Sequence, residues 1–316
     1  MPEGDSLVRL ADQLRPVLES KTLVRTDFRT PQLATLDLSG RLVDAVRPWA
    51  KYLLFRAGDL TILSHLKMEG RWEAYPLTND AGTPVTPRWR HPGWQARCVL
   101  QTERHQVVGF QLGLLEVVPT ASVADRLAFL GPDLLDPDWD ELPRADALMN
   151  EAVRRLSSDP DRPVGLALLD QSLVSGIGNI YRCEVLLLAR LDPHRSVGSV
   201  PDLPGLLGLA RDLMRANIEP ARPGSRPPRR TTTQVTPDDG APYGVRVTPA
   251  RATVQHRPGR STPPGQRTWP SHWVYGRQRE GCLRCGGPVA VEPFGDEQAN
   301  SPAESRTLYW CRQCQR

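Results

Sequence analysis

The chain of 316 residues carries 40 Lys and Arg against 36 Asp and Glu, and 39% of its residues are hydrophobic. This length suffices for two or three domains, each with its own core. No run approaches the roughly 20 apolar residues of a membrane span, and no basic segment precedes an apolar stretch at the N-terminus. We therefore expect neither a membrane protein nor a secreted one, but a cytoplasmic protein.

The first residues read Met-Pro-Glu-Gly. A small second residue such as Pro2 normally allows removal of Met1, which would leave a secondary amine that could act as a nucleophile. The alternative is a frayed terminus without a function. Residues 4–19 place apolar side chains on one helical stripe, so Glu3 is expected at a helix N-terminus, where a carboxylate is favoured.

Short alternating segments follow from about residue 22 to 118 and predict strands of an antiparallel sandwich or barrel. The chain has three lysines, Lys21, Lys51 and Lys67. Lys51 begins one predicted strand, while Lys67 and Met68 lie just past the end of another. A turn with a long basic and a long apolar side chain could enter a base stack, although Met68 could equally be a core residue.

Helical patterns return at about 145–157, 164–172, 178–190 and 202–217. Within them, GIGNIY (Gly176 to Tyr181) predicts a glycine turn whose backbone N–H groups suit a phosphate oxygen, with Asn179 as a further donor. The alternative is an ordinary turn in which Asn179 is the N-cap. From 220 to about 270, Pro, Arg, Thr and Gly dominate and predict a mobile segment.

The six cysteines fall into two groups. Cys98 and Cys183 stand alone in apolar segments and are expected in the core. The others form two Cys-x2-Cys pairs, which predict one tetrahedral zinc site: Cys282, Cys285, Cys311 and Cys314. Because four thiolates leave no position open for water, the zinc should be structural rather than catalytic.

Taken in order, these motifs resemble one family, the Fpg/Nei DNA glycosylases, which include formamidopyrimidine-DNA glycosylase and endonuclease VIII. The resemblance spans nearly the whole chain, through MPEG, AKYLL, SHLKMEG, LGPDLL, LLDQ to GIGNIY and EVL, VYGR, and SRTLYWCRQCQ. It implies a multidomain α+β protein with an N-terminal antiparallel β-sandwich and helix (1–120), a helix–two-turns–helix domain (121–219), a flexible segment in the lesion-loop region (220–272) and a C-terminal zinc ribbon, or zinc finger, with four cysteine ligands (273–316). We expect a monomer.

The resemblance also implies a function, that of a bifunctional DNA glycosylase and AP lyase of base excision repair. Pro2 matches the nucleophile that attacks C1′ of the damaged nucleoside, and Glu3 matches the general acid/base. Lys51 matches a proton donor in β-elimination. Arg306 matches the zinc-finger arginine that contacts phosphate and assists δ-elimination.

The same resemblance implies DNA contacts. Asn179 matches the asparagine that holds phosphate, and Lys67 and Met68 occupy the wedge loop that fills the gap left by an extruded base. The implied partner is damaged DNA, double- or single-stranded, with no membrane involved.

Several segments indicate the branch. Pro31–Leu33, Leu168–Gln171 and the YWC before the last cysteine pair are similar to endonuclease VIII, which removes oxidised pyrimidines. The RRFG wedge of the purine-lesion branch aligns with Gln106–Gly109, without its Arg and Phe, which suggests a preference for single-stranded or bubble DNA. Gly165 stands where many purine-branch members carry a DNA-contacting lysine. Asp5 and Ser6 replace a Pro-Glu, so a second acidic side chain near the pocket is expected to be lost.

Two alternatives stay open. One is a purine-lesion glycosylase of the same family, acting on formamidopyrimidine or 8-oxoguanine through the same Pro2. The other is a non-catalytic zinc-finger protein that binds damaged DNA through basic clusters such as RPPRR.

Overall fold

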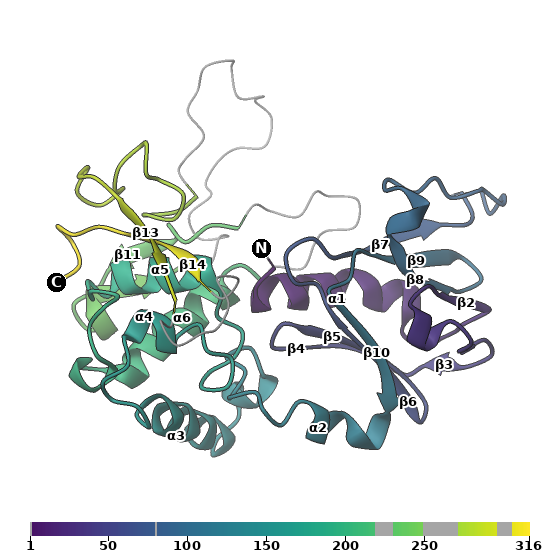
Figure 1. Cartoon of the computed structure of the whole chain (residues 1–316), viewed down its shortest axis with the longest axis horizontal. Coiled ribbons are helices and arrows are strands. Elements are labelled where there is room, and N and C mark those ends of the chain that lie inside the picture. The colour runs from purple at the N-terminus through teal and green to yellow at the C-terminus, as the bar shows by residue number, and fades with distance from the viewer. Residues whose placement is uncertain (1, 80, 219–229, 249–270, 296–304) are drawn as a thin grey trace. The chain divides into compact units, whose positions relative to one another are not determined.

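The structure is a computed structural model that describes residues 2–79, 81–218, 230–248, 271–295 and 305–316. These described residues divide into two compact units, one of residues up to Phe129 and one from Leu130 onward, which we call the N-terminal and C-terminal units. Figure 1 labels their helices and strands. The predicted zinc finger falls in the C-terminal unit, as does the predicted helical domain apart from residues 121–129, which belong to the N-terminal unit. No helix in these described ranges is long and apolar enough to cross a membrane.

The N-terminal unit is built on two four-stranded antiparallel sheets, with strand orders β10-β6-β5-β4 and β2-β8-β9-β7, and the short β1 and β3 pair with each other. The predicted β-sandwich is therefore confirmed. The strands are β1 Lys21–Thr22, β2 Arg25–Phe28, β3 Leu42–Val43, β4 Ala45–Trp49, β5 Tyr52–Ala57, β6 Leu60–His65, β7 Arg71–Pro76, β8 Ala96–Gln101, β9 His105–Phe110 and β10 Leu114–Pro119; short helical segments are η1 Pro31–Leu33, η2 Gly93–Gln95, η3 Thr120–Ser122 and α2 Val123–Arg126.

Helix α1 (Gly4–Leu18) packs along this sandwich, as the apolar stripe predicts. Its buried leucines join a core that includes Phe55 and Trp72. Arg15 Nε donates to the Val46 carbonyl at 3.0 Å, and Val46 N–H donates to Glu19 at 3.2 Å. The C-terminal end of α1 is thus fixed at the start of β4, and its other end, which carries Pro2 and Glu3, is directed toward the β4–β5 turn.

Because of the strand register, several turns lie at the same end of the N-terminal unit. His65 is the register partner of both Tyr52 and Leu114, and Phe110 is the partner of both Arg71 and Ala96. Four segments therefore meet there, and we call them together the turn end: Ala50–Lys51, Leu66–Gly70, Pro92–Gln95 and Gln111–Gly113.

The C-terminal unit surrounds helix α5 (Asn179–Leu188), all of whose residues are buried. Predicted helices are confirmed here, although the one expected over 164–172 ends at Ala167. Asp170 accepts the Ser172 N–H at 2.9 Å, a local turn that competes with helix. The elements are η4 Pro137–Asp140, α3 Arg144–Leu156, α4 Val164–Ala167, α5, η5 Val197–Ser199, α6 Leu203–Arg215, β11 Val235–Pro237, η6 Pro242–Gly244, β12 Val245–Val247, β13 Ala290–Phe294 and β14 Arg306–Trp310.

Part of the segment predicted to be mobile is ordered. Within 230–248, β11 and β12 form an antiparallel hairpin, and Val235, Val245 and Val247 pack against the helical core. The prediction was wrong for this part because three valines, too few to form a core, suffice to attach a hairpin to an existing one. Residues 219–229 and 249–270 lie outside the described residues.

A buried carboxylate attaches the start of the zinc-finger segment to α5. Glu184 accepts the backbone N–H groups of Trp273, Val274 and Tyr275 at 2.7 to 2.9 Å, and it also accepts the hydroxyl of Thr232. This contact joins two of the motifs, because EVL begins with the acceptor Glu184 and VYGR begins with two of the donors, Val274 and Tyr275.

We expect Glu184→Ala to destabilise the C-terminal unit by about 3 kcal/mol or more, since three backbone donors would lose their acceptor at about 1–3 kcal/mol each. Glu184→Gln keeps one acceptor oxygen and should cost less. Urea unfolding of both variants against the wild type measures the difference. Equal stability of all three proteins would contradict this account.

Candidate functional site

Glu3 is the N-cap of α1 and is fully buried. Its N–H donates to Ser6 Oγ at 3.4 Å, and its carbonyl accepts the Ser6 N–H at 2.9 Å. The predicted position at a helix N-terminus is confirmed, directly after a half-buried Pro2. Asp5 is also fully buried in this turn. The N-cap and the first turn thus each contribute one buried acidic residue.

Two of the three lysines gather around one histidine at the turn end. Lys51 stands in the two-residue turn between β4 and β5, and Lys67 in the turn between β6 and β7. His65 ends β6, and its pKa is lowered to about 4, mainly by burial and further by the charges of Lys51 and Lys67. The structure therefore places both ammonium groups near a neutral imidazole.

Hydrogen bonding fixes the tautomer of His65. The backbone N–H of Lys67 donates to Nδ1 at 3.0 Å, which assigns the ring proton to Nε2. Tyr52 packs edge-on against the ring, with centroids 4.9 Å apart. His65 is thus held as a neutral hydrogen-bond donor beside two cations.

The turn that carries Lys67 and Met68 presents an exposed apolar side chain. Lys67 adopts a φ of 50°, and Met68 is 56% exposed, so the alternative that Met68 is a core residue is wrong. A Cβ on Gly113 would lie 2.5 Å from Lys67 Cγ, which shows that the β9–β10 turn lies directly against the Lys67 side chain.

The predicted counterpart of the second wedge is wrong in its position. Gln106–Gly109 lie within β9, paired with both β7 and β8, and Val107 and Val108 are fully buried. A residue in the middle of a sheet cannot enter a base stack without breaking the ladder. The adjacent turn is Gln111–Gly113, which also contains neither Arg nor Phe.

In the C-terminal unit, the structure brings two predicted residues close together. Asn179 Nδ2 donates at 2.8 Å to the carbonyl of Thr307, the residue next to Arg306, and Asn179 Oδ1 accepts from Arg182. Gly178, not Asn179, is the N-cap of α5, so the capping alternative is wrong. Asn179 instead connects the start of α5 to the strand that begins with Arg306.

Gly165 has no space for a side chain. A Cβ at this position would lie 2.9 Å from both the Pro193 carbonyl and the Phe294 ring. A lysine could therefore not be accommodated there without moving backbone.

The four cysteines of the two pairs converge. Their sulfurs all lie within 4.8 Å of one another, with Cys285 and Cys311 at 3.5 Å and Cys282 and Cys314 at 4.0 Å. A tetrahedral ion with bonds of about 2.3 Å requires sulfurs about 3.8 Å apart, so the cluster can bind a metal. Cys98 and Cys183 are buried as expected, and burial raises the pKa of Cys183 to about 11.

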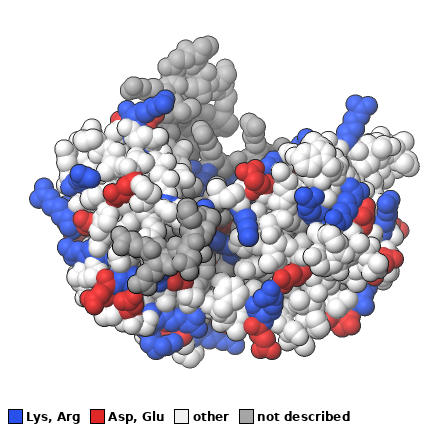
Figure 2. Space-filling view, viewed as in Figure 1, with Lys and Arg blue, Asp and Glu red and all other residues white. Residues whose placement is uncertain are grey.

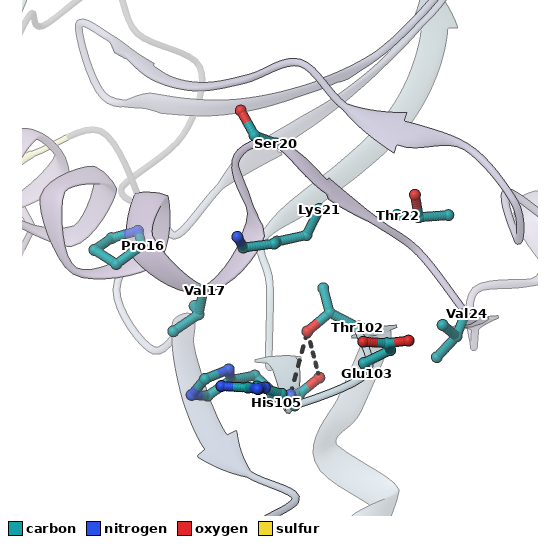
Figure 3. A pocket seen from close by; sticks show the side chains of 10 residues that line it. Pro16, Val17, Ser20, Lys21, Thr22, Val24, Thr102, Glu103 and His105 are labelled. Atoms are coloured by element: carbon teal, nitrogen blue, oxygen red, sulfur yellow. Dashed lines mark hydrogen bonds between the residues drawn. The ribbon is translucent and has the colours of Figure 1, made fainter.

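A cleft of about 650 Å³ lies at the opposite end of the N-terminal unit from the turn end (Figure 3). Thr102 and His105 form hydrogen bonds within it, and the oppositely charged Lys21 and Glu103 both line it. It holds none of the predicted site residues. Over the face in Figure 2, Lys and Arg are likewise mixed with Asp and Glu. The depth of a cleft and the charge of the surface therefore do not by themselves identify the candidate site.

Comparison with known proteins identifies the family. Residues 1–111 match the formamidopyrimidine-DNA glycosylase N-terminal domain, and residues 140–226 match the H2TH domain of the same enzyme. The chain is 36% identical over 315 residues to "DNA-(apurinic or apyrimidinic site) lyase Nei2" of Mycolicibacterium smegmatis, covering 100% of this chain and 99% of the relative. The chain belongs to the formamidopyrimidine-DNA glycosylase family.

Other comparisons indicate the branch and the fold. "Probable endonuclease 8 2" of Streptomyces coelicolor is 36% identical over 319 residues, covering 100% of this chain and 94% of the relative. The formamidopyrimidine-DNA glycosylase of Paracoccus denitrificans is 30% identical over 249 residues, 73% of this chain and 83% of the relative. Lactococcus lactis Fpg, in a complex with abasic-site DNA, has the same fold, with a TM-score of 0.66 at 21% identity and complete coverage of both chains.

Sequence reasoning missed two residues of the candidate site. His65 is in the quoted SHLKMEG and Arg182 follows GIGNIY. The position of His65 in the sequence, between Lys51 and Lys67, could have indicated that it belongs to the site. The sequence contains no comparable signal for Arg182, because its burial results from the packing of α5 against β14.

We expect His65 to stay neutral at pH 6 and to titrate near pH 4 in an NMR titration of the folded protein. Its pKa lies below the ordinary 6.5, so protonation favours the unfolded chain. Its contribution to folding is present above pH 6.5 and is lost as the pH falls toward 4. His65→Gln should therefore lose less stability over this interval than the wild type. A midpoint near 6.5 would refute the assignment.

Proposed function

We propose that this chain is a bifunctional DNA glycosylase and AP lyase that excises oxidised pyrimidines and cleaves the strand by β,δ-elimination. One observation carries the proposal: Pro2 directly precedes the buried N-cap Glu3 in a chain that is 36% identical, over its full length, to a protein named an AP-site lyase. We propose that it acts as a monomer on bacterial DNA in the cytoplasm.

The proposed reaction begins with the amine of Pro2, after removal of Met1. An α-amine ordinarily titrates near pH 8, so a useful fraction is unprotonated at neutral pH, unlike an ordinary lysine. Its lone pair forms a bond to C1′, the bond from C1′ to the base breaks with its electron pair, and the base takes up the proton that the pyrrolidine nitrogen loses. Glu3 supplies the proton that opens the deoxyribose ring at O4′, which leaves an iminium between Pro2 and C1′.

The iminium then serves as an electron sink. Loss of a C2′ proton forms a C2′=C3′ double bond and expels the 3′ phosphate, which is β-elimination. Loss of the C4′ proton then expels the 5′ phosphate, which is δ-elimination. We assign proton donation in the first step to Lys51, and phosphate binding during the second to Arg306. The neutral His65 beside Lys51 offers a further Nε2–H donor.

The remaining DNA contacts come from both units. Asn179, beside the strand of Arg306, is proposed to hold a phosphate at the start of α5, where backbone N–H groups add donors. Lys67 and Met68 are proposed to fill the gap in the base stack after extrusion of the damaged base, which costs a few kcal/mol.

We further propose that the metal of the cysteine cluster is Zn²⁺. Four sulfur ligands with tetrahedral spacing suit zinc and leave no position for water. The ion would then hold the ribbon that carries Arg306 and take no part in the reaction.

Two features favour the pyrimidine branch. The relatives named endonuclease 8 2 match more of this chain, at higher identity, than the P. denitrificans formamidopyrimidine-DNA glycosylase does. Gly165 leaves no space for the lysine found in many purine-branch members. Lesion choice is therefore one readout of the experiment below.

Borohydride trapping on oligonucleotides with an abasic site, an oxidised pyrimidine or 8-oxoguanine tests the proposal. We expect an adduct at Pro2, located by mass spectrometry, on the abasic and pyrimidine substrates. Pro2→Gly or retention of Met1 should abolish it. Lys51→Ala should slow strand cleavage at least about tenfold, whereas Lys21→Ala, at the opposite end of the unit, should leave the rate unchanged.

The outcomes of this experiment separate the alternatives. Trapping on 8-oxoguanine in place of the pyrimidine would support the purine branch. Absence of an adduct on every substrate, from protein that has lost Met1, would support a binding protein without catalysis.

Elemental analysis of the purified protein should find one zinc per chain, and Cys285→Ser should lose the metal together with DNA binding. Cys98→Ala, which removes a core thiol outside the cluster, should keep it. Full zinc content in Cys285→Ser would show that the ion binds elsewhere.

A further inference from the structure

The most exposed aromatic side chain described in the structure is Trp94, 71% exposed within η2 at the turn end. A single exposed apolar side chain is common on protein surfaces, so Trp94 is informative only through the rigid support and the positive charges that accompany it. The indole is not needed by the core below it, which Trp89 and Phe110 fill with ring centroids 5.7 Å apart.

The segment that carries Trp94 is held rigidly. Arg29 Nη1 donates to the Gly93 carbonyl at 3.1 Å, and Arg97 Nη1 donates to the Trp94 carbonyl at 2.9 Å. Below them, the Trp89 ring lies 3.8 Å from where a Cβ on Gly93 would be. Trp89 itself donates to Gln106 at 2.7 Å. An exposed ring on a fixed support loses little conformational entropy on binding.

A chain of contacts connects Trp94 to the wedge turn. The Gln111 N–H donates at 2.8 Å to the carbonyl of Gln95, beside Trp94, and the Gly113 N–H donates at 3.0 Å to the carbonyl of His65. Gly113 also lies against the Lys67 side chain. The turn Gln111–Gly113 therefore lies between two others, Leu66–Gly70 and Pro92–Gln95. Met68 is the exposed apolar side chain of the former, and Trp94 is that of the latter.

Positive charge accompanies the exposed ring. The Arg97 side chain makes no hydrogen bond other than the one to Trp94 in the described part of the chain, so Nε and Nη2 can reach a ligand. Arg88 and Arg90, which precede the turn, are exposed. An aromatic ring with guanidinium groups around it is the arrangement by which proteins bind single-stranded nucleic acid, through base stacking and phosphate contacts.

We propose that Trp94 is a stacking platform for an unpaired base of single-stranded or bubble DNA, with Arg97 on the adjacent phosphate. This inference rests on the proposed function and assigns a strand-selectivity site to it. In a duplex every base except the one opposite the lesion stays paired and stacked, so the bases flanking the lesion are not available to Trp94. The platform therefore favours DNA with an unpaired base near the lesion.

Binding to three oligonucleotides with the same tetrahydrofuran abasic analogue tests this, one single-stranded, one in a bubble and one in full duplex. Trp94→Ala should weaken single-strand and bubble binding about tenfold and duplex binding less than about twofold. Trp94→Phe should lie in between. Phe129→Ala, the matched exposed aromatic control, should leave all three unchanged.

Two further measurements locate the contact. A 5-iodouracil in the unpaired region should crosslink to Trp94 under long-wavelength ultraviolet light, as mapped by mass spectrometry. Arg97→Gln should lower the slope of log Kd against log salt by about 0.7 on single strands, the value for one lost phosphate contact.

Equal weakening on all three substrates, unchanged binding in Trp94→Ala, or a crosslink only elsewhere would each overturn the proposal. Borohydride trapping by the same proteins separates this failure from that of the enzyme. A wild type that traps abasic DNA while Trp94→Ala shows no strand-dependent loss keeps the proposed function and rejects the platform. If the wild-type protein forms no trapped adduct and yet crosslinks through Trp94, the platform is kept and the proposed function is rejected.

Discussion

The strand register around His65 is the constraint on which the N-terminal unit depends. Because His65 is the partner of residues in both β5 and β10, the turns before β5 and β10 are fixed at the end where β6 stops. A slip of one residue would turn each side chain to the opposite face. Lys51 and Lys67 would then no longer share one imidazole, and Gly113 would no longer lie against Lys67.

The turns at the turn end contain strained backbone conformations as well as the proposed functional residues. Ala50, Lys67 and Gln111, one in each of three turns, have φ values of 47° to 53°, a region that is unfavourable for residues with a side chain. Such strain persists only where the surrounding structure fixes it, and it is concentrated at functional sites. Here the paired strands supply the fixation, and the proposed wedge and stacking platform both gain from a rigid support.

The C-terminal unit depends on a buried helix, α5, whose polar side chains form hydrogen bonds with neighbouring segments. Asn179 and Arg182 bond to the Thr307 carbonyl in β14, and Glu184 takes three N–H groups of the segment before the cysteines. One helix thereby sets the position of the strand that carries Arg306. The phosphate contacts proposed for Asn179 and Arg306 therefore depend on the packing around this helix.

Local patterns in the sequence were enough to specify the elements and the chemistry that depends on short spacing. The apolar stripe of α1 placed Glu3 at a helix start, and the two Cys-x2-Cys pairs specified a four-sulfur cluster, because both follow from residues close in sequence. Whether a side chain is buried, and what it faces, was settled by the packing of the folded chain. That packing placed Gln106–Gly109 inside a sheet, exposed Met68 and Trp94, and joined Asn179 to Thr307, more than a hundred residues away. Such contacts arise between distant segments, and local patterns carry no record of them.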